Sequence, residues 1–289
     1  GHVEVVKALA KGKGKGKGQG KGKNGGGANI NRRANDGMSP VWAAAYRGDT
    51  EMVEALAQFG ANLDTPHNNG TSPVFIASEN GHVVTVESLA RLGANLNLQR
   101  HADGATAVFI ASRLGHMAIV KMLAQHGANL ETPSNDGGAT AVIMASMWGH
   151  TPTVKILAQH GADLSKCRTD IGFPSLLLAT WKGHAPTVAA LLAYGADPSF
   201  ATTQHEEGAP IGSTARSIAK AKGHTEVIRV LDGDVHYCYG VACEKSGASK
   251  CARCHRAWYC RRECLRRDWP RHKPHCDSAA AAAAATEAE

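Results

Sequence analysis

The stretch TAVFIASRLGHMAIVKMLAQHGANL (residues 106–130) decides the fold, because it contains one complete structural unit. In its second half, Ile119, Val120 and Leu123 recur at the spacing of one helix face, and Gly127 follows as a helix stop. Its first half shows the same helical periodicity and ends at the Gly-His pair of residues 115–116. The stretch therefore predicts two short helices joined by a turn at Gly-His.

The same unit recurs along the chain. Gly-His pairs begin at residues 81, 115, 149 and 183, so that 34 residues separate each pair from the next. A second marker, Gly-Ala-Asn or Gly-Ala-Asp, keeps the same phase at residues 60, 93, 127, 161 and 195. Fixed-period self-similarity is typical of solenoids, in which each unit packs only on its neighbours. The sequence therefore predicts a mainly α-helical array.

Composition narrows the class of protein further. The chain has 289 residues, of which 43% are apolar and 5% aromatic, which favours small and closely packed helices. It contains no apolar run of the roughly 18–20 residues that span a bilayer, so we expect no membrane partner. It also contains no phosphate-binding loop, nucleophile elbow or paired-carboxylate motif. We therefore expect neither catalysis nor a small-molecule substrate.

The units resemble the ankyrin repeat over roughly residues 1–232. The family's T-P-L-H-L-A-A stretch is matched by SPVFIAS (72–78), TAVFIAS (106–112) and TAVIMAS (140–146). The family's motif histidine, which bonds the neighbouring loop, is replaced in this chain by Trp42, Phe75, Phe109, Ile143, Leu177 and Ser217. We therefore expect stacking to depend more on apolar burial and less on hydrogen bonds from side chains to loops.

The ankyrin resemblance implies a concave protein-binding face at the ends of the first helices. The candidate partner-binding residues on this face are Tyr46, Arg47, Arg113, Trp148, Trp181 and Lys182. Tyr, Trp and Arg are enriched in binding hot spots. The alternative is that Trp148 and Trp181 only pack against the next repeat. For the Gly-His histidines we predict a turn role, because repeats about 10 Å apart cannot share a metal with bonds of about 2.0–2.1 Å.

A second feature is the block of residues 238–276, which contains seven of the eight cysteines. With His272 these cysteines make eight ligands, enough for two structural tetrahedral zinc sites that would supply much of the folding energy of so small a domain. A disulfide framework is the weaker alternative, because the odd count leaves one thiol over. Together with the lone Cys167, these thiols suit a reducing compartment, so we expect a cytoplasmic or nuclear protein.

The block resembles the MYND-type zinc finger, most closely over residues 259–276. The resemblance implies interleaved sites, with one zinc ion held by Cys238, Cys243, Cys260 and Cys264 and the other by Cys251, Cys254, His272 and Cys276. It also implies a peptide-binding role for Trp269 and for the residue at Leu265, where the family commonly has Gln. Without that Gln, binding of proline-rich peptides is an open question.

Two alternatives for the finger remain open. Residues 236–277 have a formal charge of +6, which falls to about +3 once seven thiolates and two zinc ions are counted. A solvated basic face is therefore the stronger interpretation, and nucleic-acid contact is the weaker alternative. MYND fingers also occur within lysine methyltransferases, so the chain could be a targeting fragment of such an enzyme.

The predicted organisation follows from these motifs. Its segments are a truncated repeat with a Lys/Gly-rich insertion at 11–26 (1–35), the ankyrin array (36–232), a linker (233–237), the finger (238–276) and a disordered Ala-rich tail (277–289). The sequence thus predicts a zinc-binding, non-catalytic adaptor in which the array and the finger each bind a protein or peptide partner.

Overall fold

The computed structural model describes residues 29–203, 209–234, 249–250 and 258–259. Its helices are α2 (Pro40–Arg47), α3 (Thr50–Gln58), α4 (Pro73–Glu79), α5 (Val83–Arg91), α6 (Ala107–Arg113), α7 (Met117–Gln125), α8 (Ala141–Met147), α9 (Thr151–Gln159), α10 (Ser175–Trp181), α11 (Ala185–Ala193), α12 (Ala215–Lys222) and α13 (Thr225–Leu231). Even-numbered helices are the first helices of the units and odd-numbered helices the second. The predicted helical repeat is confirmed.

Capping residues set where the first helices begin. Ser39 Oγ accepts a hydrogen bond from the amide of Trp42 at 3.1 Å, and Ser72 Oγ accepts one from Phe75 at 3.2 Å. Each serine is followed by proline at the first helical position, where the missing N–H costs nothing. The recurring Ser-Pro pair of these two units therefore starts a helix at the same point in each.

The helical pattern of residues 106–130 is confirmed by burial. Ile119, Val120 and Leu123 on α7 are fully buried, as are Val108 and Ala111 on α6. Burying an aliphatic side chain of this size stabilises a fold by about 1.5–3 kcal/mol, so each repeat gains most of its stability from this shared face.

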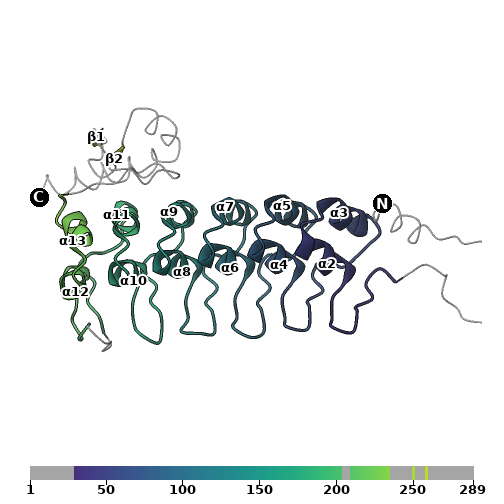
Figure 1. Ribbon diagram of the computed structural model, residues 1–289, viewed down its shortest axis with the longest axis horizontal. Coiled ribbons are helices and arrows are strands. Elements are labelled where there is room, and N and C mark those ends of the chain that lie inside the picture. Colours follow the sequence, from purple (N-terminus) through teal and green to yellow (C-terminus); the bar gives the residue numbers. More distant parts are fainter. Residues whose placement is uncertain (1–28, 204–208, 235–248, 251–257, 260–289) are drawn as a thin grey trace, which may run out of the picture. The chain divides into compact units, whose positions relative to one another are not determined.

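The helices group into two units. Helices α2–α5 belong to the first unit and α8–α13 to the second, whereas α6 and α7 are each divided between them. In the second unit the first helices α8, α10 and α12 form one layer and the second helices α9, α11 and α13 form another (Figure 1). In the first unit α2 packs against α4 and α3 against α5. Within each unit these helices therefore contact their equivalents in the neighbouring repeats, as in a solenoid.

The loops are held by more side-chain contacts than the replacement of the motif histidine predicts. Trp42 Nε1 donates to Thr71 Oγ1 in the next loop at 3.1 Å, because the indole supplies the N–H that histidine would have supplied. The ring of Phe75 lies 4.8 Å from the guanidinium carbon of Arg100, a cation–π contact with the next loop. The expectation of fewer side-chain hydrogen bonds to loops is therefore wrong at Trp42, whereas the buried ring of Phe75 contacts the loop without a hydrogen bond.

At the other replaced positions the outcome differs by residue. Apolar burial is found at Phe109, Ile143 and Leu177. Ser217, in contrast, is exposed and caps its own helix, accepting from the amide of Thr214 at 2.9 Å. Burial therefore replaces the loop bond only where the side chain is apolar and offers no donor.

Part of the predicted organisation lies outside the described residues. This is the case for the truncated repeat at 1–10, the insertion at 11–26 and the tail at 277–289. From the cysteine block the structure describes strands β1 (Ser249–Lys250) and β2 (Trp258–Tyr259), which pair antiparallel. Within the described segments, none of the helices has the length and apolarity to cross a membrane.

Candidate protein-binding face

The Gly-His histidines join consecutive repeats. His184 Nε2 lies 3.1 Å from the carbonyl oxygen of Met147, in the preceding repeat. A carbonyl only accepts, so Nε2 must bear the proton and donate. The same bond joins His82 to Tyr46 at 3.1 Å, His150 to Arg113 at 3.0 Å and His224 to Trp181 at 3.0 Å. The predicted turn role thus gains a second part, a hydrogen bond that fixes the end of a first helix.

At Gly115, Gly149 and Gly183 the glycine of the pair lies against the imidazole of the following repeat. Gly149 has φ +73°, and a Cβ added there would lie 2.8 Å from both Cγ and Nδ1 of His184. Side chains rarely adopt this φ and real Cβ atoms do not approach so closely, so the position requires glycine for two separate reasons. We call this arrangement of glycine, imidazole and carbonyl the histidine ladder.

Burial gives the His184 imidazole a pKa below its ordinary value. The bond to the Met147 carbonyl opposes this lowering, and electrostatic interactions with Lys182 and the neighbouring imidazoles of His150 and His224 add to it. The direction is physically consistent, because both desolvation and like charge disfavour the protonated ring. The His184 ring is therefore harder to protonate than a solvent-exposed imidazole.

The residue directly before the glycine of each Gly-His pair lies at the end of a first helix. In the second unit these residues are Leu114, Trp148, Lys182 and Lys222, which we call the pre-glycine row. Leu114 is 42% exposed and Trp148 is 55% exposed, and both lysines are also exposed. An indole exposed to this extent is a large apolar surface available for a partner.

The two tryptophans predicted to bind a partner have different surroundings. The ring of Trp181 packs edge-on against Phe173 at a centroid distance of 5.7 Å, and Lys222 Nζ lies 3.6 Å from its centroid. Trp181 is thus half-buried between its own loop and the next repeat, which supports the packing interpretation for this residue. No repeating motif marks Phe173, so this contact could not be predicted from the sequence.

The remaining candidates lie at the predicted helix ends. Tyr46 is 51% exposed and stacks on Trp42 at a centroid distance of 5.5 Å, and Arg47 beside it is exposed. These two residues belong to the first unit, and the half-buried Arg113 belongs to the second. Binding by any of them, and by the pre-glycine row, stays a prediction.

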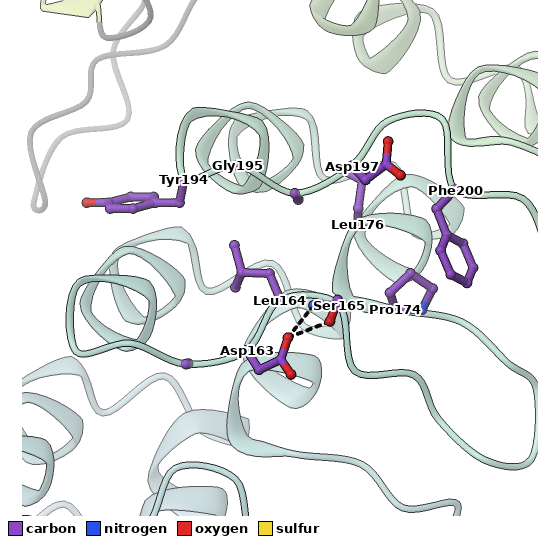
Figure 2. Close-up of a pocket in the computed structure, with 11 residues that line it drawn as sticks. Asp163, Leu164, Ser165, Pro174, Leu176, Tyr194, Gly195, Asp197 and Phe200 are labelled. Carbon is purple, nitrogen blue, oxygen red and sulfur yellow. Dashed lines mark hydrogen bonds between the residues drawn. The ribbon is translucent and has the colours of Figure 1, made fainter. Parts of the chain in front are cut away.

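A cavity of about 390 Å³ lies between two successive loops of the second unit (Figure 2). Its walls include Leu164, Leu176 and Tyr194, and two carboxylates line it, those of Asp163 and Asp197. Each carboxylate accepts from the backbone and hydroxyl of a serine two residues later, namely Ser165 and Ser199. These bonds lower the pKa of both carboxyls and identify them as turn caps. Both carboxylates are thus engaged by hydrogen bonds within their own loops.

Cys167 is the free cysteine of the described chain, and it is half-buried. Burial raises the pKa of its thiol, with a further contribution from the charge of Asp163. A thiol of raised pKa is a poor nucleophile, because the thiolate is the reactive form.

All eight predicted zinc ligands lie outside the described residues, as do Leu265 and Trp269. Within the described residues there is no group of three or more His, Cys, Asp or Glu side chains placed to bind a metal ion. Seven thiols and one imidazole are the donor types that structural zinc prefers, so the residues present fit this metal.

Comparison with known proteins finds matches to both predicted parts of the chain, the repeat array and the zinc finger. A family model described as ankyrin repeats (3 copies) matches residues 1–100 and 85–168, and one described as MYND finger matches residues 234–276. The chain is 45% identical over 53 residues to the N-lysine methyltransferase SMYD2 of Gallus gallus and 50% identical over 40 residues to that of Homo sapiens. These matches cover 18% and 14% of this chain, but only 12% and 8% of the two relatives.

Solved structures resemble the array. The ankyrin repeat protein EF0377 superposes with a TM-score of 0.60 at 27% identity, covering 67% of this chain and 96% of that one. An ankyrin repeat domain from Acinetobacter baumannii gives a TM-score of 0.59 at 25% identity, with the same coverage of both chains. Together with the repeat geometry, these matches show that the chain belongs to the ankyrin-repeat family and contains a MYND zinc finger after its repeats.

Proposed function

We propose that this chain is a non-catalytic adaptor that binds one protein through the ankyrin array and a second protein or peptide through the MYND finger. The observation that supports this most directly is Trp148, an indole 55% exposed at the end of α8 and held there by the bond between His184 and Met147. A pre-positioned aromatic side chain loses little entropy on binding, which is the usual property of an interface anchor.

Both types of domain found in the chain are non-catalytic. The similarity to lysine methyltransferases is confined to the finger and spans 8–12% of the relatives named above. We therefore propose no methyltransferase activity for this chain. The proposal includes two structural zinc ions in the finger, because eight ligands in tetrahedral sets leave no open coordination position for a substrate.

We also propose a reducing compartment, the cytoplasm or nucleus, because zinc binding requires the seven finger cysteines as thiolates. A thiol-specific label applied to intact cells before lysis tests this. The proposal expects no inter-cysteine disulfide in the recovered chain, and a disulfide-bonded finger would contradict it.

A quantitative pull-down with the full chain tests the adaptor role. The wild type is compared with Trp148→Ala in the array and Trp269→Ala in the finger, after nuclease treatment of the lysate. We expect each substitution to remove a different set of proteins while the other set is retained. If neither variant changes what is captured, or if all capture depends on nucleic acid, the adaptor role is refuted.

A further inference from the structure

The pre-glycine row is continuous across the second unit. Helix α8 contacts α10, and α10 contacts α12, so Trp148, Lys182 and Lys222 occupy equivalent positions in three successive repeats. Packed helices lie about 8–10 Å apart, and an extended chain advances about 3.3 Å per residue. About three residues of an extended segment therefore correspond to one step along the row.

The row changes in character from one end to the other. Leu114 and Trp148 are apolar and exposed, whereas Lys182 and Lys222 are cationic. Helices α8, α10 and α12, at whose ends Trp148, Lys182 and Lys222 lie, have the sequences AVIMASM, SLLLATW and ARSIAKAK and contain no aspartate or glutamate. A ligand matching the row would accordingly present apolar side chains first and carboxylates next.

The cations of the row keep their charge available. Lys222 Nζ lies over the face of Trp181 at 3.6 Å, a contact that positions the ammonium without neutralising it. Neither Lys182 nor Lys222 has a carboxylate partner within 4.0 Å among the described residues. The carboxylate of Asp170, in the loop before α10, is by contrast paired with Arg168. Complementary charge across an interface favours both encounter and specificity.

We infer that the pre-glycine row of the second unit binds an extended acidic segment of a partner protein, with apolar side chains against Leu114 and Trp148 and carboxylates against Lys182 and Lys222. This inference rests on the proposed adaptor function and specifies the ligand of its array. The spacing requires about three residues between successive anchor side chains.

The test uses the full chain and a fluorescein-labelled 12-residue peptide, with leucine at positions 2 and 5, glutamate at positions 8 and 11 and serine elsewhere. Fluorescence anisotropy measures its affinity. The comparison ligands are the same peptide with lysine in place of glutamate, a register-scrambled isomer, and single-stranded and duplex 12-mers of DNA. The scrambled isomer and the lysine peptide are expected to bind the wild-type chain more weakly than the acidic peptide.

Charge reversal then locates the contact. Lys182→Glu is expected to weaken binding of the acidic peptide several-fold, and the pair of reversals at Lys182 and Lys222 about tenfold. Lys182→Glu is expected to strengthen binding of the lysine peptide in return. The matched control is Arg91→Glu, which changes net charge equally on α5 of the first unit and is expected to leave both affinities unchanged.

The outcomes separate this inference from the adaptor role. The acidic segment is refuted as ligand if Lys182→Glu and Arg91→Glu weaken peptide binding equally. It is also refuted if DNA binds more tightly than the acidic peptide and loses the same affinity in Lys182→Glu. If the peptide fails while proteins captured from lysate are still lost in Trp148→Ala, the adaptor role stands and the acidic ligand is refuted. If the peptide fails and neither Trp148→Ala nor Trp269→Ala changes what is captured, both are refuted.

Discussion

The histidine ladder can be tested by adding one methyl group. In Gly149→Ala the new Cβ would lie 2.8 Å from Cγ and Nδ1 of His184, so the imidazole must move away. Its bond to the carbonyl oxygen of Met147, 3.1 Å long in the native structure, is then lost. The natural control is Gly161→Ala, because Gly161 also has a positive φ, +84°, but an added Cβ there meets nothing within 4 Å.

The two substitutions share one cost and differ in another. Placing alanine at a left-handed φ costs about 1–2 kcal/mol in either position, and the gain from a less flexible unfolded chain is also common to both. Only Gly149→Ala loses the hydrogen bond, at about 1 kcal/mol, and displaces a packed ring. We expect Gly149→Ala to destabilise the protein by about 2–4 kcal/mol, about 1–2 kcal/mol more than Gly161→Ala.

Urea unfolding followed by circular dichroism at 222 nm measures this difference. A double-mutant cycle assigns it, because in a His184→Ala background Gly149→Ala is expected to cost no more than Gly161→Ala. Equal destabilisation by the two glycine substitutions in the wild-type background would refute the reasoning, since backbone strain would then account for the whole effect.

Three further predictions follow from the same structure. Burial lowers the pKa of His184 in the folded protein, so its contribution to stability is complete above the unfolded-state pKa near 6.5 and decreases as the pH falls below that value. His184→Gln is expected to reduce this decrease, as measured by urea unfolding at a series of pH values around 6.5. Trp181→Ala is expected to destabilise the protein by about 2 kcal/mol and Trp148→Ala by no more than about 0.5 kcal/mol, as measured by thermal or urea unfolding. Similar losses of stability in the two variants would contradict the different burial of the two side chains. Chelation followed by a colorimetric zinc assay is expected to release two ions per chain from residues 234–276, and a single ion would refute the two-site assignment.

The repeat could be predicted from sequence because its signal is periodic and local. Apolar residues at 119, 120 and 123 recur at helical spacing and prove fully buried, and Gly127 ends the helix as expected. A pattern of this kind depends only on which face of a helix is apolar. It is therefore independent of details in the neighbouring repeats.

The contacts between repeats could not be predicted in the same way. Trp42 and Phe75 both replace the motif histidine, yet one donates a hydrogen bond to Thr71 and the other receives the guanidinium of Arg100. Each outcome depends on a partner in the next loop rather than on the residue itself. Likewise Trp148 and Trp181 occur at neighbouring positions of the same motif, and only Phe173 and Lys222 make the second one a packing residue.

The ladder also links stability to binding in the second unit. Its hydrogen bond ends on Met147, and the next residue, Trp148, is the most exposed aromatic side chain of the described candidates. A backbone carbonyl fixed on one side limits how far the adjoining side chain can move, so the contact that stacks the repeats also orients the indole. The Gly-His pair at residues 183–184 consequently fixes the backbone beside Trp148, the proposed binding residue of the repeat before it. Substituting His184 should therefore weaken partner binding through Trp148 even under conditions where the array stays folded.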